Sequence, residues 1–252
     1  MREPLETAAR FSGRVADYAK YRPSYPVEAI DAILDGAGDP RSLTIADIGA
    51  GTGISARLFA ERGATVIAIE PNPEMRAAAS HVGLDARDAD AEHTGLDDQS
   101  VDVVTSFQAF HWFATDTAVR EFVRILRRGG RVALVWNVRD AEHPVTAEYS
   151  RIADLDSAAA QRAGQVADDS DLSALLRNGG LADFRSYVFR NRQRLTLDAL
   201  LGRARSASYV PKSGPEHDVI MRDLRALHRR SAGADGRLEL AYRTTVHLAA
   251  KA

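Results

Sequence analysis

The chain has 252 residues, of which 45% are hydrophobic, and its formal net charge is −2. It contains no cysteine, which excludes disulfides, zinc thiolate sites and cysteine nucleophiles and leaves the redox compartment undecided. This composition predicts one globular domain over 1–252. The sequence shows neither a signal-like apolar start nor a run of roughly 20 apolar residues, so the cytoplasm is the expected location and no membrane partner is expected.

Residues 1–40 form an N-terminal segment with an unusual density of aromatics and prolines over 18–26. By itself this pattern predicts a capping segment before a helix that begins at Val27.

An apolar run over 43–48 then predicts a strand, and a helix is expected over 53–62. Between them, Gly49, Gly51 and Gly53 stand at every second position, which is the kind of turn that brings backbone N–H groups close to a nucleotide-like ligand. A dinucleotide fingerprint needs its third glycine at position 54, where this chain has Ile54, so the spacing argues against NAD.

The next strand, over 65–70, ends in Glu70, which lies close to the spacing expected of a carboxylate that binds both hydroxyls of a ribose. Pro71 and Pro73 end this strand, and Pro73 opens a helix over 73–80. A short strand over 84–88 leads into an acidic stretch, 88–92. A fourth strand, 101–106, leads into the aromatic stretch 106–113, which is expected to face a ligand or to pack beneath a lid.

A helix over 115–127, capped by Gly129 and Gly130, and a strand over 130–136 complete a core at 41–140. Helices are expected at 145–165 and 171–176, and strands at 185–189 and 238–248. Between these strands an insertion, 195–236, with helices near 197–206 and 216–230, is expected as a lid or as packing decoration. The alternation predicts an α/β, Rossmann-like, doubly wound sheet of seven strands, mostly parallel with the last strand antiparallel.

The turn at 46–53 resembles the first motif of class I S-adenosylmethionine-dependent methyltransferases, and the stretches 18–26 and 108–113 resemble the type 11, small-molecule group. The resemblance implies S-adenosylmethionine as the cofactor. In its terms the N-terminal segment 1–40 folds over the cofactor and Arg22 pairs with the methionine carboxylate. Asp90 with Ala91 meets the adenine, with Asp88 as the competing choice. The cofactor-binding residues that follow are Tyr18, Arg22, Asp47, Gly49, Ala50, Gly51, Gly53, Glu70, Pro71, Met75, Asp90, Ala91, Glu92 and Phe107.

The same resemblance implies that the aromatic stretch after the fourth strand faces the substrate. The expected substrate-binding residues are Gln108, His111, Trp112, Trp136 and Tyr209. His111 is either a general base or a structural histidine hydrogen-bonded under the lid, and Trp112 is either a core residue or a ligand contact. A short similarity to plant carboxyl methyltransferases leaves carboxyl methylation open.

The predicted function is methyl transfer to a small molecule, directed at O, N or a carboxyl group, by in-line displacement and with no metal. Residues 185–230 carry eleven Lys and Arg against four Asp and Glu, which favours either an anionic substrate or a solvated helix face. The stretch 106–109 lacks the Asn/Asp-Pro-Pro-aromatic tetrad of nucleic-acid amine methyltransferases, which argues against nucleic acid. RNA or protein methylation and a cofactor-binding module without methyl transfer are the alternatives, and the acceptor atom and oligomeric state are undetermined.

Overall fold

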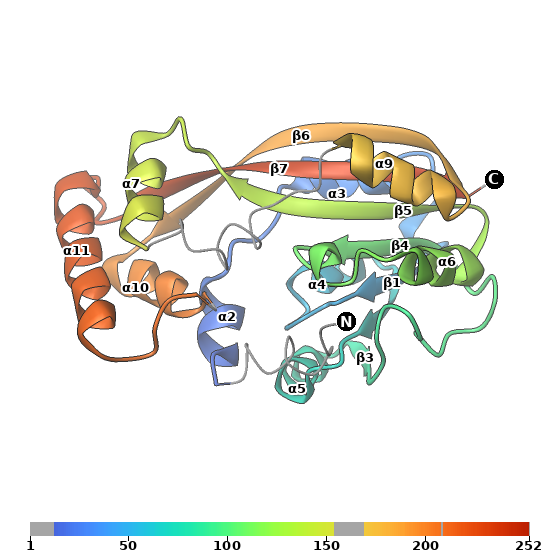
Figure 1. Cartoon of the computed structure of the whole chain (residues 1–252), viewed down its shortest axis with the longest axis horizontal. Coiled ribbons are helices and arrows are strands. Elements are labelled where there is room, and N and C mark those ends of the chain that lie inside the picture. Colours follow the sequence, from blue (N-terminus) through green and yellow to red (C-terminus); the bar gives the residue numbers. More distant parts are fainter. Residues whose placement is uncertain (1–12, 154–168, 208, 252) are drawn as a thin grey trace.

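The computed structural model of the chain describes residues 13–153, 169–207 and 209–251. Seven strands form one sheet in the order β3-β2-β1-β4-β5-β7-β6 (Figure 1). Neighbours from β3 to β5 are parallel, whereas β7 runs antiparallel to both β5 and β6. The predicted Rossmann-like sheet with an antiparallel last strand is therefore confirmed. The strands are β1 (Thr44–Ile48), β2 (Thr65–Ile69), β3 (Asp85–Arg87), β4 (Val101–Phe107), β5 (Leu126–Arg139), β6 (Leu181–Leu195) and β7 (Leu238–Lys251).

Helices cover both faces of the sheet, because alternate residues of each strand point to opposite sides. Ile45 of β1 packs in a cluster with α3 and α4, while Ile48 packs in a second cluster with α6 and α9. The helices are α2 (Val15–Tyr21), α3 (Val27–Leu34), α4 (Ile54–Ala60), α5 (Pro73–His81), α6 (Asp116–Ile125), α7 (Pro144–Ile152), α9 (Asp169–Asn178), α10 (Leu197–Arg205) and α11 (Pro215–Ser231), with short 3-10 turns at Pro40–Ser42 and Phe110–Trp112.

Two boundaries differ from the prediction. The helix expected to run to residue 127 ends at Ile125, and β5 begins at Leu126 rather than at residue 130. Leu126 already has extended backbone angles (φ −68°, ψ 135°) and pairs with Val101 of β4. Arg127 is held on this strand by an ion pair of 2.6 Å with Asp102, so the basic run extends the sheet instead of closing the helix.

The strand predicted at 185–189 is much longer in the structure, where β6 pairs with β7 along its whole length from Leu181 to Leu195. The strand predicted at 238–248 begins where expected and continues three residues further, to Lys251. Most side chains of β6 are exposed or half-buried polar groups, so no apolar run marks its length. The helix expected over 145–165 is found as α7, and residues 154–168 lie outside the described part of the chain.

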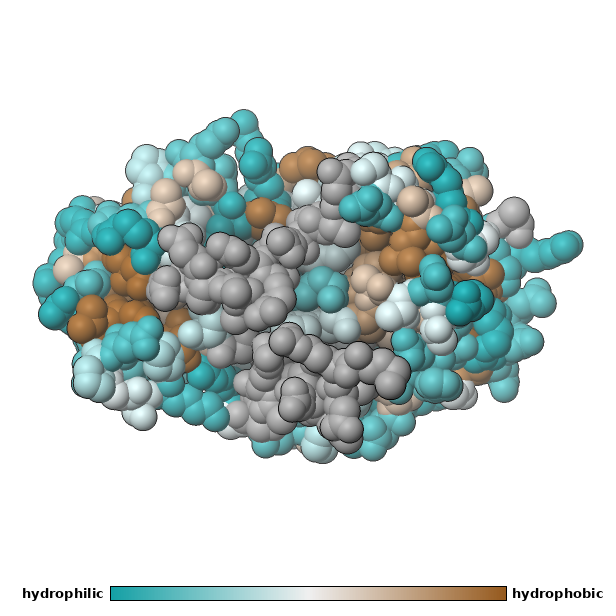
Figure 2. Space-filling view, in the orientation of Figure 1, coloured by the Kyte–Doolittle hydropathy of each residue, from teal (hydrophilic) through white to brown (hydrophobic). Residues whose placement is uncertain are grey.

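The helices α7, α10 and α11 gather at the far end of the long strands (Figure 1). They share a hydrophobic cluster of their own, which includes Tyr149, Leu200, Leu224 and Leu240. Apolar residues of this group of helices are visible among hydrophilic ones in Figure 2. The insertion between β6 and β7 is therefore a packed helical unit. In the described part of the chain, no helix combines the length and apolarity needed to cross a membrane.

The helices α2 and α10, which are far apart in the sequence, pack against each other and form a roof. Gly202 lets α10 approach closely, because a Cβ there would lie 2.2 Å from the Tyr21 ring. The Tyr21 hydroxyl donates to Asp198 Oδ2 at 2.6 Å, and the Arg14 guanidinium donates to the backbone oxygens of Arg205, Ala207 and Val210. The predicted N-terminal cover and the predicted insertion thus form one unit.

Replacing Gly202 by alanine is expected to destabilise the protein by about 1–3 kcal/mol, because the new methyl group overlaps a buried ring. Helix propensity alone predicts the opposite sign, a gain of about 1 kcal/mol. Chemical denaturation of Gly202→Ala measures the difference. The double variant with Tyr21→Leu serves as the control and should recover most of the loss, and a stabilised Gly202→Ala would contradict the packing.

Candidate functional site

The turn between β1 and α4 is built on three glycines in the left-handed region, with φ of 70° at Gly49, 57° at Gly51 and 79° at Gly53. A Cβ at Gly49 would lie 2.7 Å from that of Ala109, and one at Gly53 would lie 2.4 Å from Leu84 Cδ1. A Cβ at Gly51 would meet nothing within 4 Å. The two outer glycines are therefore required for packing, while Gly51 presents bare backbone to open space, where a ligand can approach closely.

Asp47, at the end of β1, lies beneath the turn and is fully buried. Its two carboxylate oxygens accept hydrogen bonds of 2.7 Å from the hydroxyls of Ser55 and Thr105. Burial raises the pKa of Asp47 to about 6, although these hydrogen bonds oppose the shift. Asp47 does not line the pocket described below, so the structure places it as an anchor between α4, β4 and the turn.

Glu70 directly follows β2 and is also buried. Its Oε2 accepts the Gly51 N–H and its Oε1 accepts the Asn72 N–H, each at 2.8 Å, so the carboxylate lies against the bare backbone of the turn. Burial raises its pKa, and the two backbone hydrogen bonds oppose the shift. Pro71 follows on the surface, and Met75 is buried at the start of α5. Glu70 therefore lies beside the glycine turn, and its expected contact with the ribose hydroxyls stays a prediction.

The acidic stretch after β3 lies on the other side of β2. Asp90 Oδ1 accepts the N–H groups of Glu92 and His93 at 2.9 and 2.7 Å, whereas Oδ2 has no hydrogen bond to another described residue. The competing residue, Asp88, forms an ion pair of 2.9 Å with Arg76. Ala91 is buried, and Glu92 accepts a hydrogen bond from the Thr115 hydroxyl. Asp90 is thus better placed than Asp88 to accept a further donor.

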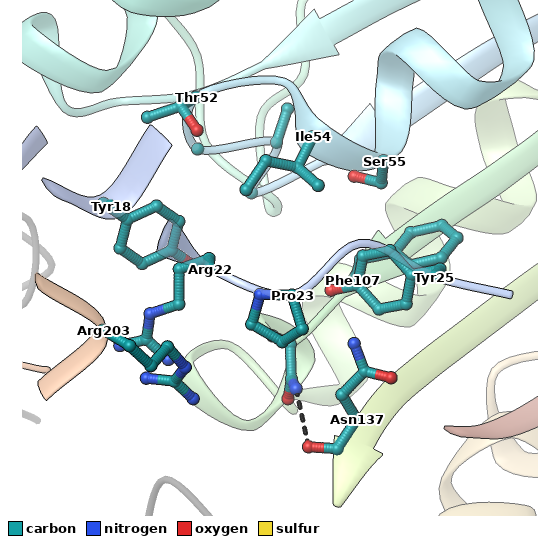
Figure 3. Close-up of a pocket in the computed structure, with 14 residues that line it drawn as sticks. Tyr18, Arg22, Pro23, Tyr25, Thr52, Ile54, Ser55, Phe107, Asn137 and Arg203 are labelled. Atoms are coloured by element: carbon teal, nitrogen blue, oxygen red, sulfur yellow. Dashed lines mark hydrogen bonds between the residues drawn. The ribbon is translucent and has the colours of Figure 1, made fainter. Parts of the chain in front are cut away.

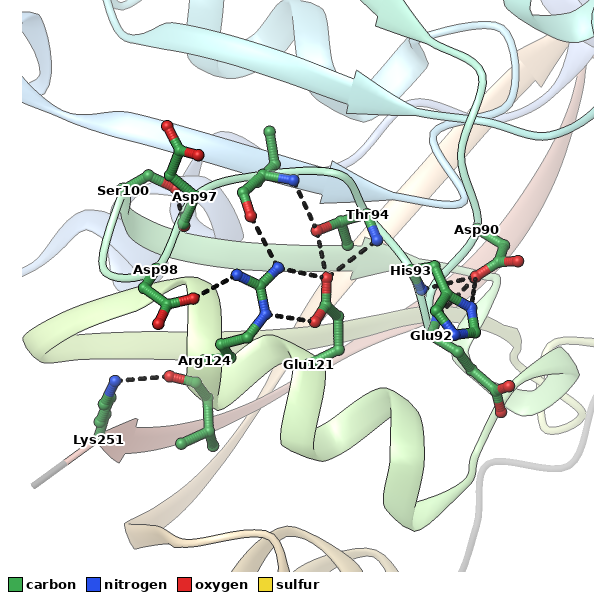
Figure 4. A network of polar contacts seen from close by, with 12 residues as sticks. Asp90, Glu92, His93, Thr94, Asp97, Asp98, Ser100, Glu121, Arg124 and Lys251 are labelled. Atoms are coloured by element: carbon green, nitrogen blue, oxygen red, sulfur yellow. Dashed lines mark hydrogen bonds and ion pairs between the residues drawn. The ribbon is translucent and has the colours of Figure 1, made fainter.

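A polar network fixes the loop that follows Asp90 to α6 (Figure 4). Glu121 accepts the N–H and hydroxyl of Thr94 at 2.9 and 2.6 Å and pairs with Arg124 at 2.7 Å. Arg124 also pairs with Asp98 and donates to the Leu96 carbonyl. Burial alone would raise the pKa of Glu121, but the hydrogen bonds from Arg124 and Thr94 outweigh it and lower the pKa to about 2.

Replacing Glu121 by glutamine is expected to cost about 2 kcal/mol of unfolding free energy at pH 7, because charge-assisted hydrogen bonds are lost. The folded pKa lies below the unfolded value of 4.5, so the contribution is complete above about pH 5 and is lost as the pH falls towards 2. Urea denaturation at pH 7 and pH 3 measures this. A difference between wild type and Glu121→Gln that is equally large at both pH values would refute the assignment.

A pocket lies between the glycine turn, the carboxyl ends of β4 and β5, and the roof (Figure 3). It brings together seven of the predicted residues, Tyr18, Arg22, Gly49, Ala50, Gly51, Phe107 and Gln108. Gly53, Glu70 and the stretch 90–92 are not among its lining residues. Seven further lining residues were not predicted, namely Pro23, Tyr25, Thr52, Ile54, Ser55, Asn137 and Arg203.

Gln108 has an unusual backbone for a residue with a side chain, with φ of 57° directly after β4. Its N–H donates to the Val135 carbonyl and its Nε2 donates to the Asn137 carbonyl, at 2.8 and 2.9 Å. Asn137 in turn accepts from Thr244 and Asn191 through its side chain. These bonds hold Gln108 and Asn137 at the carboxyl ends of β4 and β5. The strained backbone at Gln108 is of a kind that concentrates at functional sites.

The other predicted substrate residues do not line this pocket. Trp136 is 2% exposed and belongs to the core, with its ring 5.7 Å from that of His247, so the structure does not support a substrate contact there. His111 lies 4.8 Å from the Trp112 ring. Neither nitrogen of His111 has a hydrogen-bond partner among the described residues, and burial lowers its pKa to about 4. It is therefore neutral at neutral pH and lacks the hydrogen bond that a structural role required.

The glycine turn, the Glu70 carboxylate that follows β2 and the strand order agree with the expected resemblance to class I S-adenosylmethionine-dependent methyltransferases. Residues 46–134, about a third of the chain, match a methyltransferase domain family of type 11. No three His, Cys, Asp or Glu side chains of the described residues are grouped as a metal site requires.

Similar proteins carry related names. An uncharacterized methyltransferase of Mycobacterium tuberculosis, Rv3342, is 45% identical over 134 residues, which cover 52% of this chain and 53% of that protein. A demethylmenaquinone methyltransferase of Thermobifida fusca is 36% identical over 36% of this chain and 42% of its own. The match therefore spans about half of these relatives or less.

One solved structure is that of Haemonchus contortus phosphoethanolamine N-methyltransferase 2 in complex with phosphomonomethylethanolamine and S-adenosylhomocysteine. It superimposes with a TM-score of 0.58 over 94% of this chain and 56% of that one, at 17% identity. At that level of identity the similarity shows the fold alone.

Proposed function

We propose that this chain transfers a methyl group from S-adenosylmethionine to a small-molecule acceptor. The observation that carries the proposal is the juxtaposition of the bare backbone at Gly51 with the buried Glu70 carboxylate, which accepts the Gly51 N–H at 2.8 Å. A carboxylate in this position suits two ribose hydroxyls and repels a phosphate. The turn leaves room for the amino-acid half of the cofactor.

The pocket residues fit the rest of that cofactor. Thr52 Oγ1 and Arg22 Nε are buried pocket atoms without a hydrogen-bond partner among the described residues. Buried polar atoms of this kind are normally paired, so they indicate a polar ligand. In this proposal Glu70 holds the ribose, Asp90 holds the adenine amine, and Arg22 holds the methionine carboxylate.

When bound, S-adenosylmethionine supplies an electrophilic methyl group. The chain's own contribution is to align an acceptor atom with that group and to exclude water. The roof formed by α2 and α10 covers the pocket and excludes water from it. His111 does not line this pocket but is neutral at neutral pH, so we propose it as the base only for an acceptor that extends beyond the pocket lining to reach it and must lose a proton.

A small acceptor is favoured over RNA or protein because the pocket is covered by packed helices rather than open along one face. The relative that is named a demethylmenaquinone methyltransferase and the structural neighbour that holds phosphomonomethylethanolamine carry small acceptors in their names, which is consistent with this choice. The choice between O, N and carboxyl acceptors is left to experiment.

The test has two stages. Calorimetry with S-adenosylhomocysteine should detect binding to the intact protein, and release of S-adenosylhomocysteine from S-adenosylmethionine should then be measured over a panel of alcohols, amines, carboxylic acids and RNA. Binding together with turnover of a small acceptor supports the proposal. A folded protein that does not bind S-adenosylhomocysteine would overturn it, and tight binding without turnover of any acceptor would indicate a binding module.

A further inference from the structure

A buried arginine on the roof faces the pocket without a partner that neutralises it. Arg203 of α10 lines the pocket and is 4% exposed. Its Nε and Nη1 have no hydrogen-bond partner among the described residues. Figure 3 shows its guanidinium beside that of Arg22, on the side of the pocket opposite the glycine turn. Unpaired buried polar atoms are rare in folded proteins, so this arrangement requires an explanation.

The surroundings of Arg203 keep it charged but do not neutralise it. Burial by itself lowers the pKa of Arg203, but the nearby side chains of Tyr242, Tyr149 and Tyr209, together with a hydrogen bond to Tyr242, outweigh burial and raise it. Arg139 donates to the Tyr209 hydroxyl at 3.1 Å, which adds a further cation. No ion pair between described residues involves Arg22, Arg139 or Arg203.

Arg203 and its surroundings therefore contain three guanidinium groups, those of Arg22, Arg139 and Arg203, and three phenols. Among the residues described, no carboxylate is bonded to these guanidinium groups. A buried cation that lacks a counter-ion is costly, and the cost is removed when an anion binds. Arg22 and Arg203 also repel each other, since Arg203 lowers the pKa of Arg22 in addition to the larger effect of burial. One carboxylate, that of the methionine half of the cofactor, leaves the second guanidinium unmatched.

We propose that Arg203 binds an anionic group of the acceptor, a carboxylate or a phosphate, while Arg22 binds the methionine carboxylate. This inference rests on the proposed methyl transfer, and it assigns the acceptor to the class of small organic anions. A planar guanidinium with free Nε and Nη1 presents two donors to a carboxylate or phosphate. Arg203 comes from the insertion between the last two strands, outside the part of the chain that forms the cofactor turn, which is consistent with a role in choosing the acceptor.

The test compares wild type with Arg203→Met, which keeps the length of the side chain and removes its charge. Calorimetry on protein loaded with S-adenosylhomocysteine uses succinate and glycerol 3-phosphate as anionic probes, and succinamide and glycerol as their neutral counterparts. Wild type should bind at least one anion and should prefer it to its counterpart, and Arg203→Met should weaken that binding by at least about tenfold. The succinate and glycerol 3-phosphate arms distinguish a carboxylate from a phosphate.

Two controls separate this role from others. Arg225→Met, at an exposed position on α11, should change neither anion nor S-adenosylhomocysteine affinity. Arg203→Met should change S-adenosylhomocysteine affinity by less than about threefold, whereas a loss as large as the loss of anion affinity would assign Arg203 to the methionine carboxylate and overturn the proposal. Equal binding of anions and their neutral counterparts by wild type, or no binding of either anion, would also overturn it.

The stability of Arg203→Met provides an independent measurement. Replacing an unmatched buried cation by an apolar side chain of similar volume should leave the melting temperature of the free protein unchanged or higher. A fall in melting temperature would show that the chain itself neutralises Arg203 and would contradict the proposal. If wild type fails to bind S-adenosylhomocysteine, the proposed function fails, and the anion titrations on the free protein still decide whether Arg203 holds an anion.

Discussion

Replacing Glu70 by alanine is expected to weaken S-adenosylhomocysteine binding by at least about 100-fold. The proposed site uses this carboxylate for two ribose hydroxyls, and hydrogen bonds to a charged group contribute about 1.5–3 kcal/mol each. Each 1.4 kcal/mol corresponds to about a tenfold change in affinity. The same substitution removes the acceptor of the Gly51 N–H, so the turn loses one of the bonds that fix it. Isothermal titration calorimetry measures the change directly.

Two further variants sharpen this test. Glu70→Gln keeps the size of the side chain and one acceptor oxygen, so it should fall between wild type and Glu70→Ala. Glu61→Ala removes a carboxylate of the same kind from an exposed position at the end of α4 and should bind like wild type. Unchanged affinity of Glu70→Ala in a folded protein would remove Glu70 from the cofactor site.

Replacing Asp47 by asparagine is expected to stabilise the protein at pH 8 by up to about 3 kcal/mol. The folded pKa of about 6 lies above the ordinary value of 3.8, so the native state binds protons more readily than the unfolded chain. Stability therefore falls as the pH rises from about 4 to 6, and the penalty is complete above that range. An asparagine carries no charge, and its amide can still bond to the hydroxyls of Ser55 and Thr105.

Denaturant unfolding of Asp47→Asn and wild type at pH 8 and pH 4 measures this effect. The advantage of the variant should shrink below pH 6 and should be absent near pH 4. Because Asp47 is fully buried beneath the turn, whereas the proposed site uses Glu70 for the ribose hydroxyls, replacing Asp47 should reduce S-adenosylhomocysteine affinity less than Glu70→Ala does. A variant that is less stable than wild type at pH 8 would show that the charged carboxylate is needed beneath the turn.

Local patterns predicted the first half of the chain well. The strands expected at 43–48, 65–70 and 101–106 are found within one residue at each end, because each is a short apolar run between turn residues. Gly53 and Glu70 were found by their spacing. The second half was predicted less well, since β6 exposes most of its side chains and offers no run of apolar residues from which its 15 residues could be recognised.

The pocket was only half predicted, and the reason is the distance in sequence between its parts. Tyr25 lies in the aromatic stretch 18–26 and Asn137 directly follows the strand predicted at 130–136, but nothing local indicated that either would face the turn. Arg203 was one of many basic residues in a segment with excess positive charge. The burial of Arg203, the lack of a hydrogen-bond partner at its Nε and Nη1 among the described residues, and its place beside Arg22 are visible only in the folded chain.

The sequence by itself determined the parallel sheet and the bend at Gly49–Gly51–Gly53, because side-chain alternation and positive φ angles are properties of neighbouring residues. Tertiary structure alone decided what closes over that bend. The roof exists because a glycine on α10 allows the ring of Tyr21 on α2 to come into contact with its backbone, and no local pattern relates those two residues. That contact places Arg203 over the pocket, so the proposed recognition of an anionic acceptor depends on long-range packing.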